Sequence, residues 1–514
     1  MVKRVLFLGL FALLSEASSA ADMGSLSQVF MPGKGLLDTD GDGLPDRAAL
    51  TIIVPDNPGP VELALAADIA ARANFECLAQ SFAMVKRVSE VADLERLENP
   101  IFIGTNFRWL KTAVKEGGLA LPDLAPTQGW VGLFATKIQS GLVLAAGSED
   151  ALLQAGRAFF LRWPYFWDIW GREEGATFER LEKDVAGFLD GEGIPLRRTI
   201  VRSVLYDFPD FKNVPRALKK ISFSAGEIHE LGLDVHFIDE DDLRSAVRSF
   251  ESLRLAHSRG QRSDILSYAG CGRLTVDLKF GRTTVRSVLP RLGRPKRMMT
   301  PSFKDAPRGG GAGKDFDLLG LLTTKGVYGD LDRDGIVDAV DSRIIIPRTG
   351  LVRGVTALAS KIVLHTAGAS FPIVTLDREV EFPKGLLAPI LIGPNSLTQE
   401  LQRLGKLVLP PLENAFGVVR VVPRAFNKSS ALVVAGADPA GLEKTLTYLS
   451  RNFPYFEGYG DGRLQLRDAS EALERFLKGE NGAAEAYFAV EFRKLVDGLK
   501  DRDLENLKVE CLIP

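Results

Sequence analysis

Two acid-rich segments have the residue types and the spacing of a site for a hard cation. In the second segment, aspartates stand at positions 1, 3, 5, 9 and 12 of a loop that begins at Asp330, and Gly335 stands at position 6. Carboxylate oxygens at these positions can surround Ca²⁺, glycine permits the sharp turn, and the carbonyl of residue 7 adds a backbone oxygen. Mg²⁺ fits less well because it prefers fewer protein ligands. The predicted ligands are Asp330, Asp332, Asp334, Ile336, Asp338 and Asp341.

The first segment, which begins at Asp38, has the same spacing with one difference. Acids occupy positions 1, 3, 5 and 9, and Gly43 occupies position 6, but Ala49 stands at position 12. We therefore expect this loop to bind Ca²⁺ more weakly, or to take a ligand from elsewhere. The alternative for both segments is a solvated turn, because aspartate and glycine also favour turns. The predicted ligands are Asp38, Asp40, Asp42, Leu44 and Asp46.

These spacings resemble the calcium loops of thrombospondin type 3 repeats and dockerins more than those of EF-hands. Position 12 is Asp or Ala rather than Glu, and a strand-like run follows each loop instead of a helix. The resemblance implies a structural site that stays filled outside the cell, where calcium modules bind with dissociation constants of about 10⁻⁴ to 10⁻³ M. It covers about a dozen residues in each copy.

Other patterns of catalytic chemistry are missing from the sequence. The four histidines, including the HxxD pair His236 and Asp239, do not have the HExxH or HxxE spacing of zinc peptidases, and no GxSxG motif is present. The glycine-rich run at 309–315 departs from a phosphate loop, since Arg308 occupies the first glycine position and Asp315 replaces Ser/Thr. A carboxylate pair for glycoside hydrolysis stays possible because acids are plentiful. The balance of these patterns is against an enzyme.

An aromatic cluster between Trp163 and Trp170 offers a second kind of candidate site. It could form a platform for stacking a sugar or a peptide, or it could pack the end of a helix against its sheet. The Pro-Tyr-Phe part recurs at 454–456, which favours packing there. Trp167 and Trp170 have no counterpart in the second copy, so they are the candidates for ligand contact.

Both acid loops belong to a longer internal repeat. Residues 34–55 match residues 325–347, and residues 142–166 match residues 432–456 without a gap, so the offset stays at about 290 residues. Two copies are too few for a solenoid, and the pattern therefore predicts a duplicated domain.

The expected elements follow the same order in both copies. Short β-branched runs alternate with helices of 10 to 15 residues, which indicates βαβ units. The predicted fold class is α/β, with a duplicated βαβ-type domain and a mostly parallel sheet, the copies being separated by a smaller α+β or β-rich domain. Expected helices cover 60–74, 149–162, 351–364 and 439–452; expected strands cover 51–55, 100–104, two runs in 129–146, 343–347, 372–376, 389–393, 417–422 and 431–435.

These patterns also predict the domain boundaries. The middle segment has strand-like runs and one expected helix at 241–255, and the loop at 298–314 that ends it reads as a linker. The tail combines an amphipathic helix at 483–498 with a final strand-like run; ending on an apolar strand favours a natural polypeptide that continues. The predicted boundaries are 1–20 (signal peptide), 24–190 (first calcium loop and α/β copy), 193–308 (middle domain), 316–480 (second calcium loop and copy) and 483–514 (helix and strand).

The N-terminus reads as a signal peptide and predicts export to the periplasm or the exterior. Lys3 and Arg4 precede an apolar run of about ten residues, and small residues lead up to Ala20. The alternative is a buried strand or helix. No later run is long and apolar enough to predict a membrane span. The net charge of −2 argues against a nucleic-acid partner, and the three widely spaced cysteines indicate no disulfide framework.

Two paired patterns give a second resemblance: PIFIGTNF with LVLAAGSEDALLQAGRAFF, and PILIGPNS with LVVAGADPAGLEKTLTYLS. They resemble non-catalytic α/β modules of secreted polysaccharide-related proteins. The whole order is similar to the N-terminal region of large exported carboxypeptidase-like proteins. We therefore predict an exported, calcium-stabilised binding or scaffolding protein, with a glycan, cell-wall material or a protein as partner. The alternatives are the non-catalytic front part of a larger secreted hydrolase and a self-contained hydrolase.

Overall fold

A computed structural model gives the structure of the chain. It describes residues 23–93, 96–104, 121–135, 140–165, 177–208, 223–261, 265, 271–290, 297–301, 314–347, 354–369, 371–380, 383–412, 414, 416–426, 428–455, 465–468, 471, 485–492, 494–495, 502–503 and 506–512. The predicted signal peptide and residues 302–313 of the predicted linker therefore lie outside the described residues. At 298–301 the linker prediction is wrong, because these residues pair with β9 (Phe223–Phe237) as part of the strand β12 (Arg297–Pro301).

Copy 1 is built on a central run of four parallel strands. β3 (Thr51–Val54) lies between β4 (Val85–Arg87) and β5 (Pro100–Ile103), and β5 pairs with β7 (Ser140–Ala146). β6 (Gln128–Ala135) pairs with β7 in the antiparallel direction. β3 is buried along its whole length, which explains its unbroken β-branched sequence.

Two helices of copy 1 cover this sheet. α1 (Pro60–Phe75) begins with proline at its first position, where a missing N–H costs nothing, and α3 (Glu149–Phe160) is capped by the Ser148 side chain. α1 is buried on nearly all sides and is accordingly rich in alanine. Both helices agree with the sequence prediction to within two residues.

Copy 2 repeats this arrangement. Its strand order β16-β15-β17-β19-β18 corresponds to β4-β3-β5-β7-β6 of copy 1, which is what a duplicated domain predicts. The α/β fold class is confirmed, although both sheets are mixed because β6 and β18 run antiparallel to their neighbours. The elements are β15 (Ile344–Ile346), α6 (Gly354–Leu364), β16 (Val374–Leu376), β17 (Ile390–Ile392), α7 (Ser396–Arg403), β18 (Gly417–Phe426), β19 (Ser429–Gly436) and α8 (Pro439–Arg451).

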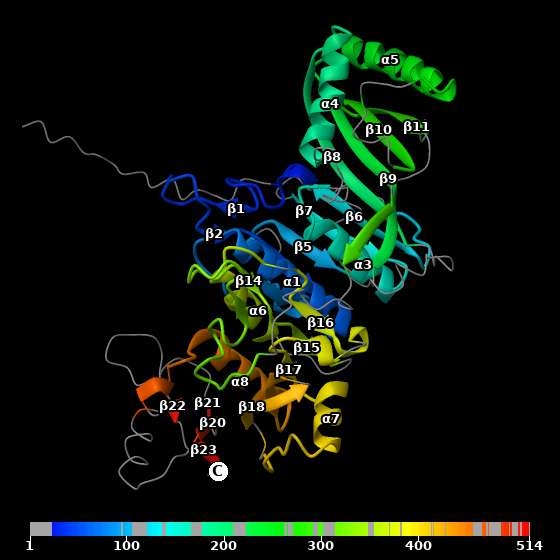
Figure 1. The fold of residues 1–514 in the computed structure, drawn as a ribbon. Coiled ribbons are helices and arrows are strands. Elements are labelled where there is room, and N and C mark those ends of the chain that lie inside the picture. Colours follow the sequence, from blue (N-terminus) through cyan, green and yellow to red (C-terminus); the bar gives the residue numbers. More distant parts are fainter. Residues whose placement is uncertain are drawn as a thin grey trace, which may run out of the picture.

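The middle segment continues the sheet of copy 1. β8 (Leu196–Asp207) pairs with β6, and β9 (Phe223–Phe237) pairs with β8, so one sheet passes from copy 1 into this region. α5 (Glu240–Ser258) lies at the far end of the molecule in Figure 1, opposite the C-terminal strands. The remaining elements are α4 (Phe178–Gly191), β10 (Arg273–Phe280), β11 (Thr283–Pro290) and β12 (Arg297–Pro301).

The predicted helix at 483–498 is wrong. The structure has strands there, β20 (Glu485–Phe492) and β21 (Lys494–Leu495), and β20 pairs with the edge of β18. The run EAYFAVEF is rich in aromatic residues, which favour strands, and pairing with β18 outweighs its helical periodicity. The final predicted strand is confirmed as β23 (Asn506–Leu512), which pairs with β20; β22 (Arg502–Asp503) pairs with β21.

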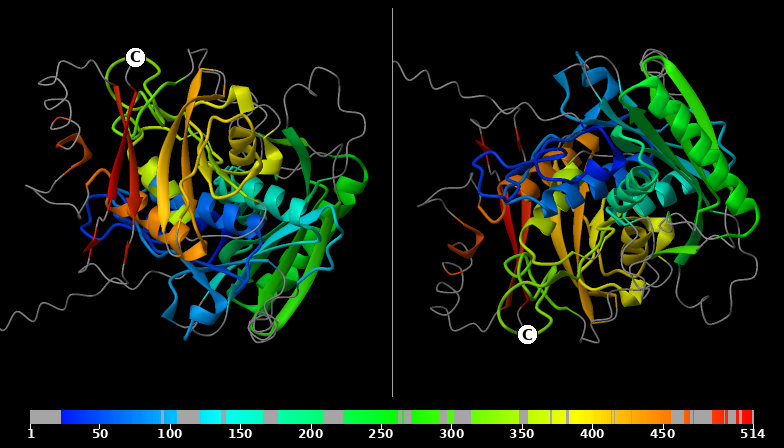
Figure 2. Two further views of the ribbon diagram at one scale, coloured as in Figure 1. Left: turned by 90° about the horizontal axis from the view of Figure 1, so that it is seen from below. Right: turned by 90° about the horizontal axis from the view of Figure 1, so that it is seen from above.

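The two copies meet along helices α1 and α6, which lie side by side in the middle of the molecule (Figure 2). Buried apolar residues of both copies form one continuous core. Polar contacts also cross the junction: Asn74 donates to the Ser360 hydroxyl at 3.1 Å, and Gln80 donates to the carbonyl of Ala357 at 2.9 Å. The copies therefore share an interior instead of being joined only by a linker.

Candidate metal sites

The first acid loop connects the antiparallel pair β1 (Leu36–Leu37) and β2 (Arg47–Ala48). The Asp38 carboxylate accepts hydrogen bonds from the N–H groups of Gly41 (2.7 Å) and Gly43 (2.9 Å). Both glycines have positive φ (80° and 88°), the conformation that glycine adopts most easily. The local sequence thus folds the loop around its first acid.

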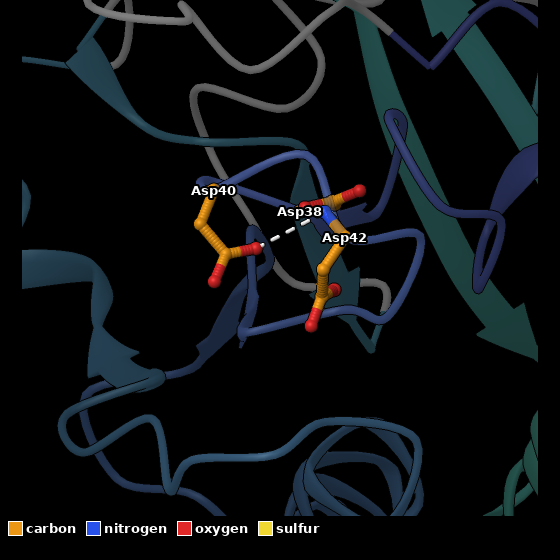
Figure 3. A group of neighbouring side chains, drawn as sticks. All are labelled: Asp38, Asp40 and Asp42. Atoms are coloured by element: carbon orange, nitrogen blue, oxygen red, sulfur yellow. Dashed lines mark hydrogen bonds between the residues drawn. The ribbon is translucent and has the colours of Figure 1, made fainter.

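The carboxylates of loop 1 gather on one turn (Figure 3). One oxygen each from Asp38, Asp40 and Asp42 lie within 4.8 Å of one another. Asp40 accepts from the Asp42 N–H at 3.2 Å, and Asp42 accepts from the N–H of Leu44 at 2.8 Å. The site is open to solvent, since Asp40 and Asp42 are exposed.

Asp46, at position 9, closes loop 1 from the other side. Its carboxylate accepts from both the backbone N–H (2.6 Å) and the hydroxyl of Thr39. These two hydrogen bonds hold the pKa of Asp46 below its usual value. Asp46 is therefore ionised at neutral pH and fixes the loop ends, while the other three aspartates form the acidic group.

The second acid loop connects β13 (Tyr328–Gly329) and β14 (Ala339–Val340) and repeats the same bonds. Asp330 accepts from the N–H groups of Arg333 (2.7 Å) and Gly335 (3.1 Å). These two residues have φ values of 65° and 90°, matching Gly41 and Gly43. The equivalent positions of the two copies therefore adopt one loop conformation.

The acidic group of loop 2 differs in one member. Oxygens of Asp330, Asp332 and Asp338 lie within 4.8 Å of one another. Asp338 accepts from the Leu331 N–H at 2.5 Å, and Asp334 accepts from the N–H of Ile336 at 2.7 Å. Both acidic groups therefore contain the aspartates at positions 1 and 3. The third carboxylate comes from position 5 in loop 1 and from position 9 in loop 2.

Asp341, the predicted ligand at position 12, has another partner. Its carboxylate is buried and lies 2.6 Å from the ammonium nitrogen of Lys314. Lys314 also donates to the carbonyls of Thr324 (3.1 Å) and Tyr328. Loop 1 has Ala49 at this position. In both loops, the acids that are not paired with a lysine in this way therefore stand at positions 1, 3, 5 and 9.

Each loop is fixed to the segment that follows the first helix of its copy. The N–H of Leu78 donates to the Pro45 carbonyl at 2.8 Å, and the N–H of Ala367 donates to the Val337 carbonyl at 2.9 Å. The side chains of Leu44 and Ile336, whose carbonyls are predicted ligands, are 53% and 61% exposed. The loops therefore stand at the surface on a rigid base.

Of the aromatic cluster between Trp163 and Trp170, Trp163 is a packed side chain, and the two candidates for ligand contact are not among the residues that the structure describes. Trp163 donates its indole N–H to the Leu26 carbonyl at 2.9 Å, and its ring meets that of Phe30 edge-on at 5.6 Å. This geometry is that of a packed side chain. Trp167 and Trp170, the predicted contact residues, lie outside the described residues.

Among the described residues, no histidine or cysteine belongs to either group of clustered aspartates. Burial lowers the pKa of His236, His257 and His365, and the thiols of Cys77 and Cys271 are buried and free. Within the described residues, the two aspartate trios are the groups with metal-binding spacing. Oxygen donors of this kind suit a hard cation.

Sequence reasoning missed a buried charged cluster at the junction of the copies. Asp68 of α1 and Arg157 of α3 are almost completely inaccessible, and Arg157 donates to Glu379 of copy 2 at 2.6 and 3.2 Å. One signal could have pointed to it: Asp68 is a lone acid in the alanine-rich run LALAADIAARA. A charge there needs a buried partner.

A family model described as "S-layer like family, outer domain" matches residues 42–451, about four fifths of the 514 residues. No curated protein sequence matches the chain. Among the described helices, none combines the length and the apolar character that crossing a bilayer requires.

Proposed function

Since this chain belongs to the S-layer-like family, outer domain, and is therefore an exported or cell-surface protein of scaffold type, we propose that it is a calcium-stabilised structural subunit of a surface layer. The family match is the observation that carries the proposal. It runs through the second acid loop, through the first from Asp42 onward and through both α/β copies, so the scaffold role applies to the duplicated unit as a whole.

Calcium supplies the stabilisation in this proposal. Each trio places three carboxylates within 4.8 Å, and their mutual repulsion opposes the folded loop unless a cation screens it. Asp38, Asp40, Asp42 and Asp46 would hold the ion in loop 1, and Asp330, Asp332, Asp334 and Asp338 in loop 2. The carbonyls of Leu44 and Ile336 would complete the two sets. Exposed loops on a rigid base suit a filled structural site better than a sensor.

The partners follow from the same role. A surface-layer subunit contacts further copies of itself and the cell-wall or glycan material beneath it. Binding these partners is the activity that the scaffold role requires, and it is the activity that we propose. The alternative, a non-catalytic front part of a larger secreted hydrolase, would share the calcium loops but not the assembly.

The test uses the full chain purified with Ca²⁺ and then treated with a chelator. We expect the melting temperature to fall on chelation and to recover with Ca²⁺, and sheets or ordered oligomers in electron micrographs to depend on the ion. Asp332→Ala and Asp40→Ala should reduce the response, whereas Asp241→Ala, an exposed acid of α5, should leave it unchanged. An unchanged melting temperature would exclude the calcium role, and a monomer under all conditions would exclude the assembly.

A further inference from the structure

We propose that the junction between the two copies is a proton-responsive joint, and that Asp68 is the group that binds the proton. This inference does not depend on calcium or on assembly. It rests on the position of one carboxylate that is completely inaccessible to solvent and that holds the two copies together.

Asp68 reaches from copy 1 into the backbone of copy 2. One carboxylate oxygen, Oδ1, accepts from the N–H groups of Ile373 (2.8 Å) and Val374 (2.9 Å), where β16 begins. The other oxygen, Oδ2, is buried and accepts no hydrogen bond within the described residues. A buried carboxylate oxygen without a hydrogen bond makes the ionised form costly.

Arg157 is the nearest cation, but it is shared. Its Nε lies 3.8 Å from Asp68 Oδ2, while its terminal nitrogens donate to Glu379 and to the Val374 carbonyl. One guanidinium therefore serves two carboxylates. Arg343 adds a second buried positive charge, which itself faces Asp341 and Arg157.

Other charged groups near α1 and α6 have separate partners. Lys361 of α6 donates to the carbonyls of Leu449 and Phe453 in copy 2. At the surface, Arg378 and Asp150 form an exposed pair across the same junction. Arg72, on α1 itself, pairs with Glu76. Asp68, Arg157, Glu379 and Arg343 therefore form the charged cluster between the copies, whereas Lys361, whose pKa burial lowers to about 8, titrates within copy 2.

The groups around Asp68 shift its pKa in opposite directions, and the net shift is upward. Burial raises the pKa of Asp68 to about 7, and the Glu379 charge adds to this, against the lowering by Arg157 and by the two backbone N–H groups. An exposed aspartate has a pKa of about 3.9. The closed junction therefore binds a proton that the opened junction releases, so acid closes the joint and rising pH loosens it.

Hydrogen exchange of the full chain, followed by mass spectrometry between pH 5 and pH 9, tests this directly. The reporter is the peptide that contains Ile373 and Val374, with rates corrected for intrinsic exchange. We expect junction opening to increase by about tenfold per pH unit between pH 5 and about 6.5 and to level off above about pH 8, because only the closed state retains the proton in that window.

Asp68→Asn should abolish this dependence, since the amide can still accept from both N–H groups but cannot titrate. A peptide containing Val201 is the internal control: its N–H donates to Glu182, a separate buried carboxylate, so its own response should persist in the variant. If Asp68→Asn does not fold, Glu379→Gln serves instead. Removing that negative charge should lower the pH at which opening levels off.

A flat profile for the Ile373 peptide in the unmodified chain would overturn the proposal. So would a profile that survives Asp68→Asn, or one that Glu379→Gln moves to higher pH.

Discussion

Removing the cation that both copies share should destabilise the whole chain. Arg157→Met keeps the length of the side chain but leaves Asp68 and Glu379 without their common partner. Arg157 is 2% exposed and makes three hydrogen bonds to copy 2, at 2.6, 3.1 and 3.2 Å. Breaking a buried ion pair from one side typically costs about 3–5 kcal/mol, because the remaining charge stays buried.

The size of the loss should depend on pH. At pH 6 Asp68 is largely protonated in the folded chain, so the variant loses mainly the bonds to Glu379 and Val374, which are worth about 1–3 kcal/mol. At pH 8 the ionised Asp68 adds its own cost, and we expect the upper part of the range. Urea denaturation followed by circular dichroism measures the shift in midpoint at both values of pH.

The matched control for this experiment is Arg403→Met. Arg403 forms an exposed pair with Glu400 on the same face of α7, and exposed pairs contribute about 0–1 kcal/mol. A loss below about 1 kcal/mol for Arg157→Met at pH 8, or an equal loss in both variants, would refute the reasoning that the buried cluster joins the copies.

Three further predictions concern the loops and the acid. Lys314→Met should leave the buried Asp341 carboxylate without its ammonium and cost about 3–5 kcal/mol, as measured by urea denaturation; a neutral result would mean that Asp341 is free to act as a ligand. Gly335→Ala places a side chain at φ 90° and should lower the free energy of unfolding by about 1–2 kcal/mol. Gly187→Ala in helix α4, where φ is helical, should cause no such loss, so equal melting temperatures of the two variants would contradict the turn geometry. The pKa of Asp68 rises from 3.8 to about 7 on folding, so its protonation contributes fully to the free energy of unfolding below pH 3.8, and this contribution is lost as the pH rises to about 7. Across that window the free energy of unfolding of the wild type should fall by at most about 4 kcal/mol relative to that of Asp68→Asn. Parallel curves of unfolding free energy against pH for the two proteins would argue against the assignment of Asp68.

Local patterns predicted most of the elements correctly, for a physical reason. The helices α1, α3, α6 and α8 and most strands of both sheets follow from runs whose burial is set within each copy, whereas the short elements β4 and α7 were not predicted. Where pairing with a distant strand decided the outcome, as at β20, the helical periodicity misled. The loop spacing also placed the acids correctly on one turn in each copy, because Asx-type bonds of Asp38 and Asp330 are local.

Long-range partners could not be predicted from spacing. Position 12 is a case in point: the sequence places Asp341 in the loop register, but the ammonium that it meets comes from Lys314, before the loop. The pairing of Asp68 with copy 2 spans 305 residues. Such contacts depend on how the two copies pack, so the lone Asp68 in its alanine-rich run indicates that a buried partner is needed but not which residue supplies it.

The junction cluster is not repeated, and this asymmetry bears on its role. Leu65 of α1 packs on Gly156 of α3, and Gly354 of α6 packs on Leu446 of α8, which aligns the helices of the two copies. By this alignment Ala357 stands where copy 1 has Asp68, and Thr447 stands where it has Arg157, whereas Glu90 and Glu379 correspond. The acid and its cation are therefore present together in one copy and absent together from the other. A pair that stabilised each domain by itself would be expected in both copies. A pair that serves the contact between them is needed only once, and a single proton can then act on the whole junction.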